Sequence, residues 1–241
     1  MASKPPVAVY DACVLYPFHL RNVLIQCAFD GLVEARWTDD IHGEWMRNLA
    51  ANTPDLPMER LELTRDPMKV VLPEADVVNY RPLIEGLKLA DLDDRHVLAA
   101  AIAGKASTIV IWNLKDFPRQ DLRPYGVTSK SPDDFLADLH NTFPETLLSS
   151  VRLARLNLRK TTPTAEGFID ALQQNGLKKF ARMLRQNIGL AGLIRMIRST
   201  YRSRRLHCLK QLSRCHLRNW GCGRSEIPFG TIALPVLIRR P

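Results

Sequence analysis

The pattern of apolar and polar positions predicts short strands that alternate with helices over the first 130 residues. Val7–Tyr10 and Ile109–Ile111 are apolar without alternation, which is typical of parallel strands covered on both faces. Weaker strands are expected at 32–37, 75–79 and 127–128. Helical spacing of apolar residues predicts helices over about 17–29, 38–49, 56–71, 81–89 and 97–103. This alternation predicts an α/β fold, in which a central parallel sheet lies between layers of helices.

A different pattern begins at Ser131, a suitable N-cap that is followed by Pro132 at the first helical position and then by two acids. Four helices are predicted, at about 132–140, 144–158, 165–174 and 177–187, with no strand signal between them. Beyond Gln186 the periodicity decays. The chain therefore divides into an α/β domain at 1–130, a small all-helical C-terminal domain at 131–187 and a tail at 188–241 that we expect to be unstructured.

The tail also explains the net charge of +9. Residues 188–241 hold eleven Lys and Arg residues and one acid, a net +10, which leaves −1 for residues 1–187. Because the tail lacks an apolar face, we expect it to be dispensable for the fold. Clustered basic residues can still strengthen association with nucleic-acid phosphates without sequence preference.

The remaining composition is that of a globular protein. The first residues have no apolar region typical of a signal peptide, and no apolar run approaches the ~18 residues needed to span a membrane, so we expect a cytoplasmic protein without membrane attachment. The odd number of cysteines, 5, and their wide spacing predict no disulfide framework. Cys13 and Cys27 lie in apolar segments, which favours small buried side chains.

Four acidic residues are predicted at one edge of the sheet. Asp11 directly follows the first strand, Asp116 follows the strand at Ile109–Ile111, Asp94 opens the helix at 97–103, and Glu44 lies beside the apolar stripe of its helix. Ligands of parallel sheets bind at the carboxyl ends of the strands. Crowded carboxylates need a counter-charge, and a hard divalent cation with oxygen ligands, Mg²⁺ or Mn²⁺, usually supplies it. Such a site suits hydrolysis of a phosphodiester bond.

Four segments, in this order and spacing, resemble the PIN-domain ribonucleases, in particular the VapC-type toxins of VapBC toxin–antitoxin pairs: VYDACVLYP, WTDDIHGEWMRN, DLDDRHVLAAAIA and WNLKDFP. The resemblance extends over about Val7–Gln186, since the segment from Ser131 is similar to the C-terminal domain of some of these toxins. It implies a PIN-like three-layer α/β/α fold, Mg²⁺-dependent or Mn²⁺-dependent endoribonuclease activity on RNA, and a cognate antitoxin that covers the site. A homodimer is a further expectation.

By motif, the resemblance assigns the metal-binding and catalytic roles to four acids, Asp11, Glu44, Asp94 and Asp116. It adds possible supporting roles for Asn48, Asp93 and Asn113.

Other interpretations of these acids stay open. Asp91 and Asp93 suit helix capping, which we favour for these two, and either could replace Asp94 as a ligand. Glu44 could form a structural ion pair with Arg95 or Arg47 instead of binding metal. Asp116 could simply begin the turn at Pro118.

Trp112 is bulkier than the small polar residue expected beside such a site. A PIN scaffold that binds RNA or a partner with little catalysis is therefore the alternative function. An enzyme with an aspartyl-phosphate intermediate would need a second acid where this chain has Cys13. His42 and His96 are expected at the surface or behind the ligands, because the site is rich in oxygen donors.

Overall fold

The structure is a computed structural model that describes residues 4–89, 91–158, 161 and 163–189. The tail beyond Gly189 lies outside the described residues, and so does the expectation that it lacks regular structure.

A four-stranded parallel sheet lies at the centre, with the strand order β2-β1-β3-β4. Val9 pairs with Arg36 on one side and with Ile109 on the other. The two inner strands are buried, which explains their lack of polar alternation. The strands are β1 (Val7–Tyr10), β2 (Glu34–Arg36), β3 (Thr108–Val110) and β4 (Thr128–Lys130).

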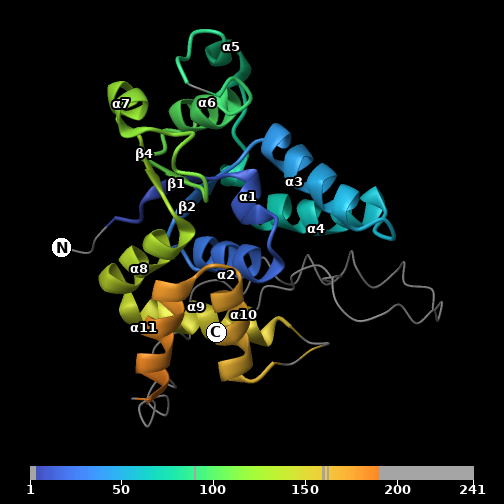
Figure 1. Cartoon of the computed structure of the whole chain (residues 1–241), viewed down its shortest axis with the longest axis vertical. Helices are drawn as coiled ribbons and strands as arrows, with labels where there is room; N and C mark the ends of the chain where they lie inside the picture. The colour runs from blue at the N-terminus through green and yellow to red at the C-terminus, as the bar shows by residue number, and fades with distance from the viewer. Residues whose placement is uncertain (1–3, 90, 159–160, 162, 190–241) are drawn as a thin grey trace.

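Helices cover both faces of this sheet. The described α-helices are α1 (Ala12–Leu15), α2 (Phe18–Phe29), α3 (Asp39–Asn52), α4 (Met58–Val71), α5 (Arg81–Ile84), α6 (Arg95–Ala103), α7 (Arg119–Leu122), α8 (Pro132–Thr142), α9 (Pro144–Leu156), α10 (Ala165–Gln174) and α11 (Lys178–Gly189). Crossovers between parallel strands are right-handed, so the connection from β1 to β2 and the connection from β2 to β3 lie on opposite faces. Figure 1 shows the sheet between α6 above and α2 below, with α8 beside α2 and α9–α11 beyond it. The predicted α/β/α architecture is confirmed.

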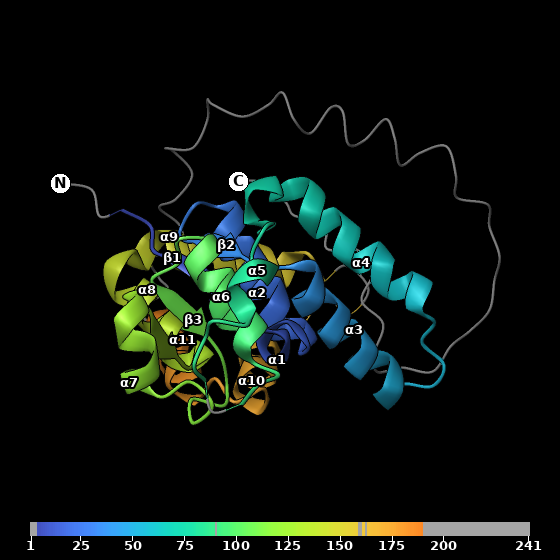
Figure 2. The same cartoon turned by 90° about the horizontal axis from the view of Figure 1, so that it is seen from above.

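Local sequence fixes where several helices begin. The hydroxyl of Thr38 accepts a hydrogen bond from the backbone N–H of Ile41 at 3.2 Å, and that of Ser131 accepts one from Asp134 at 3.1 Å. The helical segment α8–α11 is thereby attached directly to the last strand. Figure 2, a view from above, also shows α3 and α4 side by side at the periphery of the molecule.

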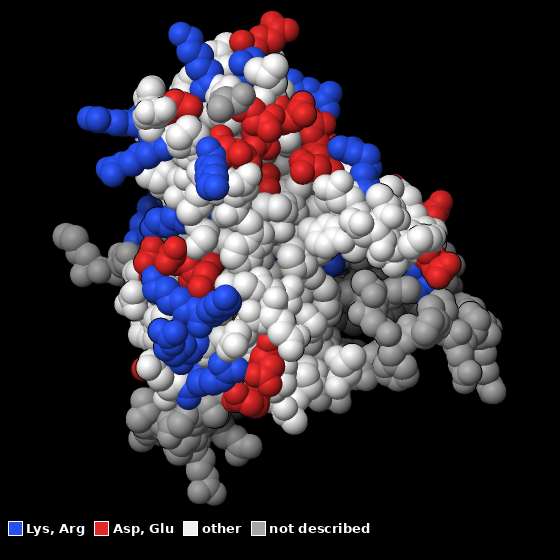
Figure 3. All heavy atoms as spheres, viewed as in Figure 1, with Lys and Arg blue, Asp and Glu red and all other residues white. Residues whose placement is uncertain are grey.

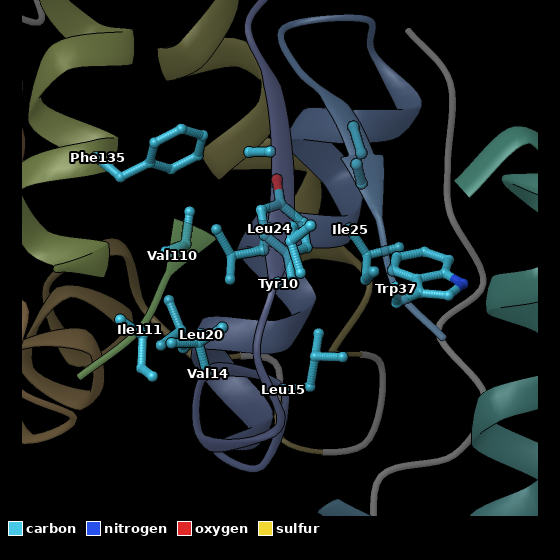
Figure 4. Close-up of a cluster of buried hydrophobic side chains, with 14 of the residues drawn as sticks. Tyr10, Val14, Leu15, Leu20, Leu24, Ile25, Trp37, Val110, Ile111 and Phe135 are labelled. Carbon is cyan, nitrogen blue, oxygen red and sulfur yellow. The ribbon is translucent and has the colours of Figure 1, made fainter. Parts of the chain in front are cut away.

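One continuous core joins the sheet and the helical segment. Figure 4 shows Tyr10 of β1 and Val110 of β3 among the side chains of α1 and α2, with Phe135 of α8 nearby. The rings of Tyr10 and Phe135 meet edge to face, with centroids 6.3 Å apart. Asn22 of α2 also donates a hydrogen bond of 2.7 Å to the carbonyl of Ala154 in α9. The position of the helical segment is therefore set by burial and by specific polar contacts.

Two expectations need correction. The strand expected at 75–79 is a 3-10 turn, η1 (Pro73–Ala75), followed by a single bridge between Trp37 and Asp76. Asn79 adopts a positive φ of 59°, which ends extended structure there. The helix expected over 81–89 stops at Ile84, shortly before Gly86.

Among the described helices, none is long and apolar enough to cross a membrane.

The sequence prediction also missed three short elements, α1, α7 and the 3-10 helix η2 (Arg123–Tyr125), because each is too short to show a period.

Candidate active site

The topology brings the ends of two central strands together. The chain leaves β1 toward β2 and later returns to β3 on the opposite side of β1. A crevice forms where neighbouring connections diverge in this way, at the carboxyl ends of the strands, and ligands of open α/β sheets bind there. Asp11 directly follows β1, the loop 111–117 follows β3, and the first residues of α6 lie at the same end of the sheet.

Asp11 is held firmly at the start of α1. Its backbone N–H donates to the carbonyl of Val110 at 3.2 Å, and its carboxylate accepts a hydrogen bond of 3.0 Å from the N–H of Cys13. The residue is only 4% exposed. Among the ion pairs of the described residues, none involves Asp11. An oriented, buried carboxylate without a cationic partner is a candidate ligand for a cation.

Asp94 interacts electrostatically with the other three candidate acids. Partial burial, and then the negative charges of Asp11, Asp91, Asp116 and Glu44, raise the pKa of Asp94 from 3.8 to about 6. Its side chain makes no capping hydrogen bond to α6, although it stands at the N-cap position. A capping role therefore does not explain why an aspartate stands at this position.

Glu44 leans from α3 toward the same place. Burial and the charge of Asp11 raise the pKa of Glu44, while His96 and Arg47 act in the opposite direction. Its carboxylate lies 3.7 Å from Nε2 of His96, and Nδ1 of His96 lies 2.6 Å from the carbonyl oxygen of Asp93. Within the described part of the chain, Glu44 thus lies against His96 and forms no ion pair with Arg95 or Arg47.

His96 accordingly lies behind Glu44, as expected for a supporting group. The two residues come from different helices, so no spacing in the sequence indicates their contact.

The expectation for His42 was partly wrong. It is fully buried, because its ring packs between Trp37 and Trp45 and its Nδ1 accepts a hydrogen bond of 3.0 Å from Nε1 of Trp45. His42 therefore belongs to the core and not to the surface.

The loop after β3 completes the group of acids. The side-chain amide of Asn113 donates a hydrogen bond to the carboxylate of Asp116, which fixes the orientation of that carboxylate. Asp91, Asp93 and Asp116 line an open surface pocket, and acidic side chains gather in the upper half of the face in Figure 3. Asp91 uses its carboxylate to accept a bond of 2.9 Å from the N–H of Asp93, a local turn contact that agrees with a capping role.

Asn48 is exposed on α3 and its carbonyl accepts a hydrogen bond of 2.9 Å from the side chain of Asn52. None of the hydrogen bonds described for this chain connects Asn48 with the four acids, and its supporting role stays a prediction.

The donors of this site fit a hard divalent cation in their chemistry. They are carboxylate and amide oxygens from four separate elements. A bound cation would relieve the repulsion between the partly buried carboxylates. Over the described residues, no three His, Cys, Asp or Glu side chains lie in an arrangement that by itself would hold a metal ion. The charges of these residues therefore influence one another, but in the described structure their side chains do not surround a common point as a complete set of metal ligands would.

Comparison with known proteins gives two matches. Residues 132–186 match the family model of the VapC50 C-terminal domain. The chain is also 38% identical over 94 residues to "Putative ribonuclease VapC50" of Mycobacterium tuberculosis (strain ATCC 25618 / H37Rv). Over part of its length, the chain is related to VapC-type proteins. The resemblance seen in the sequence is thereby confirmed for that part.

The extent of these matches is limited. The aligned region covers 39% of this chain and 54% of the VapC50 protein, so the chain spans about half the length of the curated relative that it matches. No solved structure matches the chain.

Proposed function

We propose that this protein is a divalent-metal-dependent endoribonuclease and the toxin of a toxin–antitoxin pair. The observation that carries the proposal is the mutual electrostatic interaction of Asp94 with Asp11, Glu44 and Asp116 at the crevice between β1 and β3. These acids come from separate elements, so their proximity is a property of the fold. The similarity to a protein named a ribonuclease supports the same reaction class.

The four acids would hold Mg²⁺ or Mn²⁺. When bound, such an ion supplies charge stabilisation at the scissile phosphoryl group and lowers the pKa of a water molecule. Asp11 is oriented by the N–H of Cys13, and Asp116 by the amide of Asn113. Fixed carboxylates lose little freedom when a ligand arrives, which favours binding.

His96 and Asp93 would support the site from behind. His96 lies between the carboxylate of Glu44 and the carbonyl of Asp93, so it limits the movement of Glu44. Asp93 also lines the open pocket with Asp116.

Two exposed arginines that follow the loop of Asp116 in the chain suit an RNA backbone. Arg119 of α7 and Arg123 of η2 line a surface hollow that begins two residues after Asp116 in the chain. Cations at this place would neutralise phosphates of a bound RNA, an interaction that is independent of sequence. RNA would thus be held by its backbone while the carboxylates act on one phosphate.

The proposed partner is a cognate antitoxin, and the proposed place of action is the cytoplasm. The name of the VapC50 relative supports the pairing with an antitoxin. A homodimer stays a prediction.

The test of this function is cleavage of RNA by the purified full chain. Cleavage should require Mg²⁺ or Mn²⁺, should stop when a chelator is added, and should be lost in Asp11→Asn. Asp55→Asn is the matched control, because Asp55 is an exposed aspartate in the connection between α3 and α4. RNA binding without metal-dependent cleavage would instead establish the alternative, a binding scaffold.

A further inference from the structure

We propose that the helical segment α8–α11 positions the loop of the candidate site through a contact between Trp112 and Gly176. The inference rests on the proposed function, because the loop carries Asn113 and Asp116. Trp112 and Gly176 act as positioning residues in this proposal, since neither one would touch RNA or metal.

Gly176 lies in the turn between α10 and α11, with a φ of +91°. A Cβ atom at this position would stand 2.9 Å from Cη2 and 3.2 Å from Cζ3 of the Trp112 indole. Real Cβ atoms essentially never approach a neighbour to 2.9 Å. A Cβ here would therefore strain the backbone conformation and would also require either the indole or the turn to shift.

Trp112 connects this turn to the ends of both central strands. Its backbone N–H donates a hydrogen bond of 3.4 Å to Sγ of Cys13, and Cys13 stands two residues after Asp11 in the chain. Its carbonyl accepts a hydrogen bond of 3.2 Å from the N–H of Leu114, which begins the bend that carries Asp116. Any displacement of the indole is consequently transmitted to the loop backbone.

The turn that receives the indole is itself anchored. The carboxylate of Asp133 in α8 accepts hydrogen bonds from the backbone N–H groups of Lys179 at 2.9 Å and Phe180 at 2.8 Å. Leu177 and Phe180 are fully buried in the core. A surface anchored in this way cannot easily retreat from the indole, so the loop has to adapt to it.

The bulk of Trp112 then has a structural explanation. The far edge of the indole meets the helical segment. The side chain of Asn113, the next residue of the loop, donates a hydrogen bond to the carboxylate of Asp116. The sequence drew attention to the bulk of Trp112 but gave no sign of this contact, because Trp112 and Gly176 are far apart in the chain.

The test compares alanine substitutions at three glycines that all have a positive φ, so that alanine strains the backbone in a similar way at each position. Gly31 and Gly126 also have positive φ values, of 78° and 68°, but a Cβ at either would have no neighbour within 4 Å. Gly176→Ala should lower kcat for RNA cleavage by about 10-fold to 100-fold with a smaller change in KM, because misplacement of a catalytic group by about 1 Å has an effect of this size. Gly31→Ala and Gly126→Ala should leave kcat unchanged.

A compensating variant sharpens the comparison. Phe is shorter than Trp, so Trp112→Phe in the Gly176→Ala background should make room for the new methyl group and restore most of kcat. The two substitutions should thus be strongly non-additive, as expected for residues in contact. Additive losses in the double variant would overturn the proposal.

Hydrogen exchange gives a readout that does not depend on activity. In metal-free protein, Gly176→Ala should speed exchange of the amides at 112–117, and the two control variants should not. If the wild-type protein cleaves no RNA, the proposed function fails, and exchange alone then decides the inference. If Gly176→Ala does not fold, Trp112→Phe should speed exchange in the same loop; unchanged exchange at 112–117 in the folded variant overturns the proposal.

Discussion

Replacement of Asp94 by Asn should stabilise the metal-free protein while abolishing cleavage. Burial and four neighbouring carboxylates raise the pKa of Asp94 from 3.8 to about 6, so the ionised form is unfavourable in the folded state at neutral pH. A pKa shift of one unit corresponds to about 1.4 kcal/mol, which sets an upper bound of about 3 kcal/mol. Because the residue is partly exposed, solvent screening reduces the expected effect to about 1 kcal/mol.

The direction in which the unfolding free energy changes with pH follows from proton linkage. A carboxyl group whose pKa is higher in the folded state stabilises the fold fully below its unfolded pKa of 3.8, and this contribution is lost as pH rises through about 6. Wild-type protein in a chelator should therefore lose about 1 kcal/mol of unfolding free energy from this group between pH 4 and pH 7. Asp94→Asn should not show that loss.

Urea unfolding at several pH values, with a chelator present, measures both the stability difference between Asp94→Asn and wild type and the pH dependence of each protein. Asp55→Asn serves as the control, since this exposed aspartate lies outside the group of acids. Our reasoning would be refuted if Asp94→Asn were less stable than wild type at pH 7 in the chelator. It would also be refuted if both proteins had the same dependence on pH. Retained metal-dependent cleavage in this variant would separately remove Asp94 from the ligands.

Three further predictions concern other parts of the molecule. Burial lowers the pKa of His42 from 6.5 to about 3, so its stabilising contribution is complete above pH 6.5 and is lost as pH falls toward 3. The difference in unfolding free energy between wild type and His42→Phe should shrink by about 3 kcal/mol from pH 7 to pH 4. Urea unfolding at several pH values measures this difference, and the same pH dependence in both proteins would contradict the prediction. Replacing Arg119 and Arg123 together by Gln should weaken RNA binding and lower the slope of log affinity against log salt by about 1.4, as filter binding can measure; an unchanged slope places the RNA elsewhere. A chain that ends at Asn187 should keep its thermal midpoint and its cleavage rate at saturating RNA, and failure to fold would show that the tail belongs to the domain.

Much of the fold could be predicted from local patterns. The absence of alternation in Val7–Tyr10 follows from burial on both faces, and the caps at Thr38 and Ser131 depend on side chains within three residues. Helix ends were less predictable where a turn competes with periodicity. The apolar residues after Arg81 suggested a helix as far as 89, whereas α5 ends at Ile84.

The acids of the candidate site could be predicted because Asp11 and Asp116 follow predicted strands, Asp94 begins a predicted helix, and Glu44 lies beside the apolar stripe of its helix. Their surroundings could not. The contact of Glu44 with His96 joins α3 to α6, and the contact of Trp112 with Gly176 joins the loop after β3 to the turn before α11. Such contacts depend on how the elements pack in three dimensions, and neither has a spacing or a motif in the sequence.

The most direct test of the central claim is calorimetric titration of the metal-free protein with Mn²⁺. If Asp11, Glu44, Asp94 and Asp116 together hold a divalent cation, the wild-type protein and Asp55→Asn should bind Mn²⁺ with the same affinity. Asp11→Asn and Asp94→Asn should then bind it at least about tenfold more weakly, which corresponds to about 1.4 kcal/mol. Equal Mn²⁺ affinity in all four proteins, or no saturable binding to the wild type, would contradict the assignment of these carboxylates as a metal site.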